Sequence, residues 1–439
     1  MNKDTSSRYA LKLWLEAFRS AVTTEGFLLL SFAVACIGLY YGKAMLSIST
    51  GVIFGIALLN GLMHPRFFHA LLRYRVFLAI MGIWGVYLLS GMHSDNTMRW
   101  LRLVRENAPY LMLPIGFFAY RNLPASSWIK LLWIFISMSA LSALCVMTDY
   151  AIHFRTYNEL YKVGKSIPVP VIHVRYSFFM ALAALVALSM WYEAGFNREK
   201  YDVQHVFGGK RARTLMLVIA VFLVVVVHLL AVRTGLISLY GGLGVMFICI
   251  VLKDRQWKLG LAGFAGLVML LVLAWYAFPS VQNKIAYVLY DLRMMKEQGA
   301  IPEYSDNVRI TSIRNGLALL HDHLITGTGI GDLKAETQQI YAERTPDFPV
   351  ESRYPPISQY VFIFTAFGVV GGALFFFFLI YPLFRTPFHY ILLGIYTTTL
   401  FASIGETTIE LQLGKSAFVS LVCIALLYIR ALSTSRHTS

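Results

Sequence analysis

Residues 305–332 read SDNVRITSIRNGLALLHDHLITGTGIGD. They lie inside one long polar segment, residues 279–357, in a chain that is otherwise built mostly from apolar runs. A helix-like run begins near Asn307 and ends at His321, and the glycines that follow favour a sharp turn. The contrast predicts a membrane scaffold that holds one long, mainly helical loop at one of its surfaces.

The composition of the whole chain is that of a polytopic membrane protein. Of its 439 residues, 57% are hydrophobic and only 14% are charged, whereas a soluble domain is about one quarter charged. Apolar runs of about 18 residues or more predict transmembrane helices, and therefore an all-α fold. The twelve predicted spans lie near residues 26–42, 46–63, 76–92, 106–120, 128–147, 174–194, 213–232, 234–252, 258–278, 357–384, 388–404 and 416–431.

The distribution of Lys and Arg predicts the orientation of these spans. With both termini inside, short cytoplasmic segments hold 20 such residues and short outer segments hold 10, which fits the positive-inside rule. The formal charge of +15 therefore needs no nucleic acid partner. We expect a bacterial inner-membrane protein. Its chain would consist of transmembrane helices in residues 1–278, a long periplasmic loop in residues 279–357, and further transmembrane helices with a cytoplasmic tail in residues 358–439. Residues 8–22 are expected to form an interfacial helix before the first span.

The sequence predicts neither a cofactor nor a metal. The four cysteines lie inside apolar runs without metal-ligand spacing and are interpreted as reduced core residues. They are Cys36, Cys145, Cys249 and Cys423. The chain contains no phosphate-binding Walker loop, dinucleotide fingerprint or zinc spacing.

Several Lys and Arg residues lie in the predicted outer segments, against the positive-inside rule. They therefore indicate an anionic ligand. Arg233 lies between two apolar spans with hardly a loop, where a charged residue indicates function unless it only snorkels to the interface. Arg175 begins a span, where it is a ligand contact or an interfacial anchor. Arg309 shares a helix face with Ile313, whereas Arg314 is rotated by roughly 100° from Ile313. Guanidinium groups bind phosphate bidentately. Further outer cations are Arg99, Arg102, Arg105, Arg155, Lys162 and Lys165.

Two histidines and two glutamates could also take part in chemistry. His321 and His323 could act as general bases near neutral pH, although at a helix end they more often stabilise the helix dipole. Glu406 and Glu410 are expected to form ion pairs with an outer arginine, and a catalytic carboxylate is the alternative.

Taken together, these residues resemble the bacterial O-antigen ligase and polymerase superfamily, whose members transfer glycans from undecaprenyl pyrophosphate. The stretch AVRTG around Arg233 matches the family's Arg at an outer helix junction. Residues 309–332 match its Arg-led helix and glycine-rich turn. The stretch ETTIELQLGKSAF, residues 406–418, is similar to a Glu-x-Gln-x-Gly segment of one family branch.

One position departs from the family pattern. Where the long loop enters the next span, the family has a Pro-His-Asn-Gln-Tyr-like stretch with a proposed catalytic His. Aligning Gln359 and Tyr360 places Ile357 at that position, and isoleucine cannot transfer a proton. The remaining alternatives are another base such as His321 or His323, a reaction without a strong base, or a protein without transferase activity.

The sequence therefore predicts a metal-independent glycosyltransferase at the periplasmic membrane face. Arg175, Arg233 and Arg309 would hold a lipid pyrophosphate, and Arg314, Gln359 and Glu410 would contact substrate. The acceptor is a lipid A–core sugar in a ligase, or another lipid-linked glycan in a polymerase. A silent binder or transporter of a lipid-linked glycan is the alternative of another class.

The orientation can be tested by cysteine accessibility. We expect a membrane-impermeant maleimide added outside to label the Ser305→Cys variant and not the Ser435→Cys variant, because the charge count places residue 305 outside. Both would be made in a background in which the four native cysteines are replaced by serine. Labelling of the Ser435→Cys variant in intact cells would contradict the predicted orientation.

Overall fold

The chain folds into packed helices. The computed structural model describes residues 24–64, 66–162, 167–196, 209–277, 279–298 and 305–436. Helices make up 84% of the structure, and the described residues contain no strand. The predicted all-α fold is confirmed, while the interfacial helix expected at residues 8–22 lies outside the described residues.

Within these ranges, nine helices are long and apolar enough to cross a membrane. They are α3 (Lys43–Met63), α5 (Arg75–Leu89) with η1 (Ser90–His93), α8 (Ala125–Ile152), α10 (His173–Phe196), α12 (Gly209–Leu230), α13 (Arg233–Leu252), α14 (Trp257–Ala277), α18 (Gln359–Arg385) and α20 (Gln412–Arg436).

The other three predicted spans fall on shorter helices, so twelve full spans are not confirmed. These helices are α2 (Glu25–Tyr41), α7 (Pro109–Phe118) and α19 (Tyr390–Ala402). The ten residues of α7 reach about 15 Å, which is half of a hydrocarbon core of about 30 Å. Three further short helices connect spans: α4 (Arg66–Arg73), α6 (Thr97–Glu106) and α9 (Phe154–Lys162).

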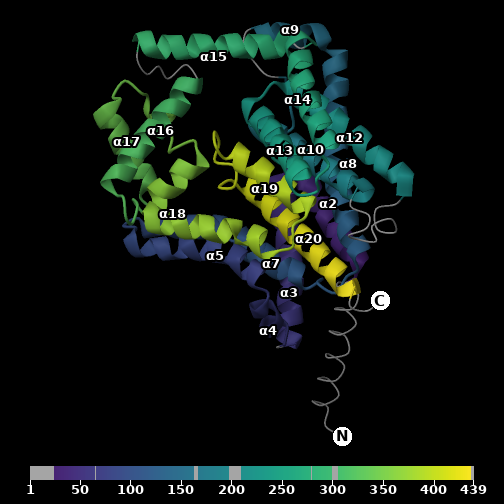
Figure 1. Ribbon diagram of the computed structural model, residues 1–439. Coiled ribbons are helices and arrows are strands. Elements are labelled where there is room, and N and C mark those ends of the chain that lie inside the picture. Colours follow the sequence, from purple (N-terminus) through teal and green to yellow (C-terminus); the bar gives the residue numbers. More distant parts are fainter. Residues whose placement is uncertain are drawn as a thin grey trace.

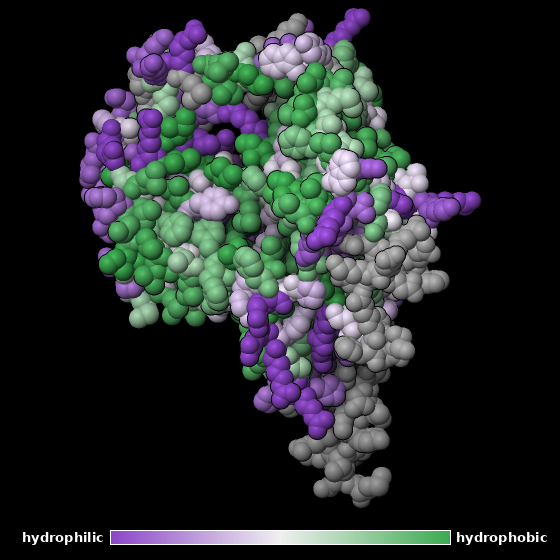
Figure 2. Space-filling view, viewed as in Figure 1, coloured by the Kyte–Doolittle hydropathy of each residue, from purple (hydrophilic) through white to green (hydrophobic). Residues whose placement is uncertain are grey.

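Helices α10 and α20 form the centre of the bundle. In each of these two helices, 78% of the residues in the apolar stretch are buried, compared with 11% in α14 at the edge of the bundle. Figure 1 shows α8, α10, α12, α13 and α14 grouped on one side, with α5 and α18 on the other and α15 across the top. Figure 2 shows hydrophobic side chains over the middle of the molecule and hydrophilic ones gathered above and below, as expected for a bundle that crosses a membrane.

The N-terminal ends of α10 and α13 are held close together. A Cβ added at Gly235 on α13 would lie 1.8 Å from Ser177 Oγ on α10, so only glycine fits there. Arg175 and Arg233 each lie two residues before this contact. The tight packing therefore fixes one arginine relative to the other.

The long polar segment consists of helices that lie outside the bundle. It contains α15 (Pro279–Gln298), α16 (Ser305–Asp322), α17 (Leu333–Arg344) and η2 (Val350–Ser352). The segment is thus mainly helical, as predicted, although its assignment to the periplasm and the three-part division of the chain stay predictions.

The turn after α16 docks on a break in α18. At Gly368 the backbone leaves the helical conformation, with φ 66° and ψ −174°. The N–H of Gly329 donates to Ala366 O at 3.0 Å, and the N–H of Val369 donates to Leu324 O at 2.8 Å. A Cβ at Gly327 would lie 2.4 Å from Gly368 N. The glycines therefore allow two backbones to approach and to exchange hydrogen bonds.

The far end of the same turn is fixed to the start of α6. The carboxylate of Asp332 accepts from the N–H of Asp95 at 2.7 Å and from the N–H of Asn96 at 2.9 Å. The N–H of Gly331 donates to Ser94 Oγ at 3.1 Å. The polar segment is thus attached to two separate elements of the bundle.

Replacing Gly368 should loosen this attachment. The conformation of Gly368 is nearly restricted to glycine, so we expect Gly368→Ala to destabilise the fold by about 1–3 kcal/mol and to lower the midpoint of thermal unfolding in detergent. Gly85 on α5 is the matched control, because a Cβ there meets nothing within 4 Å. Equal midpoints for Gly368→Ala and Gly85→Ala would contradict the role of the break.

Candidate functional site

The connection between α19 and α20, residues 403–411, lies at the centre of a polar site. Gln359 is fully buried and makes two hydrogen bonds to this connection. Its backbone N–H donates to Ser403 O at 3.0 Å, and its Oε1 accepts from the N–H of Ile409 at 3.2 Å. Tyr110 donates its hydroxyl to Ile409 O at 2.8 Å. Gln359 therefore positions the segment that carries both candidate carboxylates.

The first of these carboxylates, Glu406, meets two arginines. Its Oε2 lies 3.6 Å from Arg309 Nη2 of α16, and both side chains are partly buried. Burial raises the pKa of Glu406, while the charges of Arg309 and Arg175 act in the opposite direction. The predicted ion pair of Glu406 with an arginine is confirmed, whereas Glu410 has no arginine within 4.0 Å among the described residues and is bound by Tyr87 and Asn107 instead.

Arg309 keeps one hydrogen-bond donor unused. Its Nε is buried and finds no acceptor within the described ranges. Unsatisfied buried donors are rare and often mark the place of a water or a ligand. Arg309 therefore has capacity for an anion in addition to Glu406.

Arg233, the first residue of α13, is paired with Asp306 in the first turn of α16. The N–H of Asp306 donates to Asp291 Oδ2 at 3.0 Å, and the amide of Asn307 donates to Asp291 Oδ1 at 2.6 Å. Burial raises the pKa of Asp291, and these two hydrogen bonds oppose that shift. Arg233 is thereby connected through α16 to α15.

The three predicted arginines thus converge around the start of α16. Asp306 and Arg309 are three residues apart and lie on one side of the helix, so the Arg233–Asp306 and Arg309–Glu406 pairs are neighbours. Arg175 joins them through its charge, which acts on Glu406. Figure 2 shows hydrophilic side chains lining a hollow between α16 and α13 on this face. We call Arg175, Arg233 and Arg309 with their carboxylates Asp306 and Glu406 the arginine cluster.

Other predicted residues lie elsewhere. His321 is 89% exposed in its side chain and lies beside Asp322, with His323 also exposed. Twelve residues separate His321 from Arg309 on the same helix, which is about 18 Å along the axis. Arg314 is exposed as well. The structure does not bring these three side chains to the arginine cluster.

Ile357 packs beside α16 and contributes its backbone to the site. Its N–H donates to Ser312 Oγ at 3.2 Å, one turn after Arg309. The position that aligns with the family's histidine therefore lies next to the arginine cluster, while its side chain offers no group that can accept a proton.

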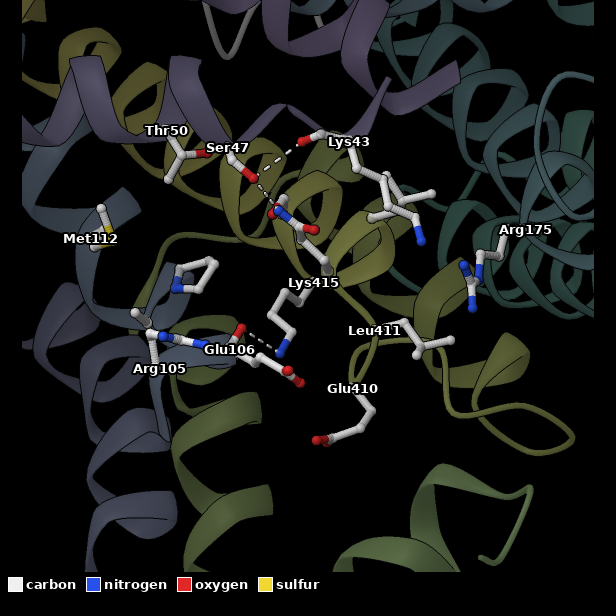
Figure 3. Close-up of a pocket in the computed structure, with 15 residues that line it drawn as sticks. Lys43, Ser47, Thr50, Arg105, Glu106, Met112, Arg175, Glu410, Leu411 and Lys415 are labelled. Carbon is white, nitrogen blue, oxygen red and sulfur yellow. Dashed lines mark hydrogen bonds between the residues drawn. The ribbon is translucent and has the colours of Figure 1, made fainter. Parts of the chain in front are cut away.

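A cavity of about 480 Å³ lies next to the 403–411 segment and is shown in Figure 3. Glu410 faces it and accepts from the Tyr87 hydroxyl at 2.5 Å and from the Asn107 amide at 3.4 Å. Lys415 is buried and donates to Asn107 Oδ1 and, at 3.1 Å, to Glu106 O. The lining consists of Lys43, Ser47, Thr50, Arg105, Glu106, Ala108, Pro109, Met112, Arg175, Glu410, Leu411, Gln412, Leu413, Lys415 and Ser416.

Lys415 is a site residue that the sequence reasoning did not single out. The sequence did contain a signal, because this lysine directly precedes the last predicted span, where a charged residue close to an apolar run indicates function. Lys43 and Glu106 gave weaker signals, since charged residues at the ends of spans are common. Within the described ranges, no three His, Cys, Asp or Glu side chains gather as a metal site, and metal independence stays a prediction.

Comparison with known families finds a match for the central part of the chain. Residues 215–376 match the family described as O-antigen ligase. The match covers less than half of the chain. It runs from α12 to α18 and contains Arg233 and Arg309, while Arg175, Glu406 and Lys415 lie outside it. A search among curated proteins found no match.

Proposed function

We propose that the protein transfers a glycan from a polyprenyl-pyrophosphate donor to a sugar hydroxyl at the periplasmic face of the inner membrane. The observation that supports it most is the convergence of Arg175, Arg233 and Arg309 at the outer ends of three helices. Three guanidinium groups suit the oxygens of a pyrophosphate, and the apolar helices around them suit its lipid.

In this reaction the arginines act on the leaving group. The acceptor hydroxyl oxygen attacks the anomeric carbon, and the bond from that carbon to the pyrophosphate oxygen breaks with its electron pair on the pyrophosphate. Preorganised cations stabilise the charge that grows there. Asp306 and Glu406 orient two of the guanidinium groups, so little rearrangement of the arginines is needed when the donor binds.

We propose Glu406 as the group that accepts the proton of the acceptor hydroxyl. It lies between Arg309 and Arg175, and burial raises its pKa, which makes it a stronger base than an exposed glutamate. After transfer the proton passes from the carboxyl group to water. His321 and His323 are the competing candidates, but about 18 Å of helix separates His321 from Arg309.

A ligase and a polymerase would use this chemistry in the same way. Both need a lipid pyrophosphate as leaving group and differ in the acceptor, which is a lipid A–core sugar in the first and a lipid-linked glycan in the second. Our proposal is the ligase reaction, with the polymerase as the close alternative.

Replacement of the arginines by lysine tests the pyrophosphate role. We expect Arg233→Lys and Arg309→Lys each to lower transfer by about tenfold or more, because lysine keeps the charge and lacks the planar bidentate donor group. The assay would use purified donor and acceptor with the protein in lipid nanodiscs. Arg344→Lys is the control, since this arginine is exposed in the last turn of α17. Full activity in both variants would exclude the role.

A second comparison tests the proton acceptor. We expect Glu406→Gln to lower kcat/KM by roughly 10²–10⁴-fold. In the wild type, activity should fall as the pH drops through the raised pKa of Glu406, above the usual range for glutamate, because the protonated carboxyl cannot accept a proton. This fall in activity at low pH should be absent in the Glu406→Gln variant. A larger loss in the double variant His321→Ala/His323→Ala than in Glu406→Gln would assign the role to the histidines instead.

A further inference from the structure

The cavity beside the 403–411 segment is a second cationic site, distinct in its residues from the Arg233 and Arg309 side of the arginine cluster. Its lining contains four cationic side chains and two carboxylates, so its formal charge is positive. The cations are Lys43, Arg105, Arg175 and Lys415, and the carboxylates are Glu106 and Glu410. We propose that this cavity binds a phosphate group of the acceptor glycolipid, an inference that rests on the proposed transferase function.

Lys415 is the strongest part of the argument. It is only 1% exposed, and a buried ammonium is unfavourable unless its donors are satisfied. Asn107 Oδ1 and Glu106 O take two of its three donors. In the described part of the chain, no carboxylate lies within 4.0 Å of Lys415 Nζ. A phosphate oxygen in the cavity would accept from the third donor and add a close counter-charge to the more distant ones of Glu410 and Glu106.

The surroundings of the cavity indicate that the anion belongs to an amphiphile. On α3, Met45 and Ile48 lie close in sequence to the lining residues Lys43 and Ser47 and are 46% and 64% exposed. Apolar side chains exposed on a membrane-spanning helix face lipid. The cavity therefore lies where a headgroup can enter while its hydrocarbon chains remain in the bilayer.

Helix α6 extends this cationic surface along the membrane boundary. Arg99, Arg102 and Arg105 follow one another at intervals of three residues, and line a second hollow of about 690 Å³ together with the exposed side chains of Met98 and Leu101. Arg105 lines both hollows. A row of arginines beside exposed apolar side chains is suited to phosphate headgroups.

The position of the cavity favours the acceptor over the donor as the source of the phosphate. Arg233 and Arg309 do not line it, while Arg175 lines it and also lies near Glu406. Glu406 and Glu410 are carried by the same short connection, one at the arginine cluster and the other at the cavity. Two membrane-anchored substrates could therefore meet across this segment, as a transfer between two lipids requires.

The test compares one acceptor with and without its phosphates. Purified lipid A–core, untreated or treated with a phosphatase, would be offered to the full-length protein in phosphatidylcholine nanodiscs with saturating donor. We expect Lys415→Met and Arg105→Gln each to raise the KM for the phosphorylated acceptor by roughly tenfold, the loss of one charge-assisted hydrogen bond. The KM for the treated acceptor and the KM for the donor should not change.

Direct binding separates this inference from the proposed function. Binding of the phosphorylated acceptor in the absence of donor should weaken by the same roughly tenfold factor in both variants, whether or not the wild type transfers glycan. Absence of transfer by the wild type would overturn the proposed function, and the binding result would still decide the inference. Lys258→Met, a lysine at the start of α14 outside the cavity, is the control and should bind like the wild type.

Three results would overturn the inference. The first is an equal loss with both forms of the acceptor, and the second is a rise in the KM for the donor. The third is competition by phosphatidylglycerol in the nanodiscs that abolishes the difference between wild type and variants, because the cavity would then be a site for membrane phospholipid. Arg105 is exposed, so Arg105→Gln keeps the test decisive if Lys415→Met fails to fold.

Discussion

The backbone hydrogen bonds between the turn at residues 324–329 and the break in α18 fix the position of the outer polar segment. A helix that breaks inside an apolar span leaves N–H and C=O groups that lipid cannot satisfy. Here Leu324 O and the N–H of Gly329 take over part of that pairing. Because the turn satisfies the broken helix, α16 has a defined position, and with it Asp306 and Arg309. The arginine cluster therefore depends on a contact that contains no charged group.

The charges of the site are balanced locally. Arg233 is opposed by Asp306, and Arg309 by Glu406. Removing one partner of a buried pair is strongly destabilising, whereas the pair itself contributes little net stability. These pairs are thus better explained by orientation of the guanidinium groups than by stabilisation of the fold. Lys415 differs, because its two hydrogen-bond acceptors are an amide and a carbonyl and it makes no close ion pair among the described residues, although Glu410 and Glu106 act on its charge from a greater distance.

Much of this arrangement follows from the length of the apolar runs and from the helical spacing of residues along the sequence. The apolar runs correctly indicated the long helices, and the rotation of roughly 100° between Ile313 and Arg314 agrees with the exposure of Arg314. The role of Asp291 at the start of α16 could not be predicted, because it comes from a different helix and depends on tertiary packing. The length of α7 was left open by the sequence, because Pro109 and Pro114 make the fourth predicted span ambiguous, and the helix does begin at Pro109.

The shared connection between Glu406 and Glu410 couples the two sides of the site. Gln359 and Tyr110 hold this connection as one unit, so a ligand that displaces one carboxylate also shifts the other. Thermodynamic linkage then requires that each ligand alter the affinity for its counterpart by the same factor. The cooperativity between two bound ligands, and not only the affinity for each, would therefore depend on the short chain segment that joins the last two helices.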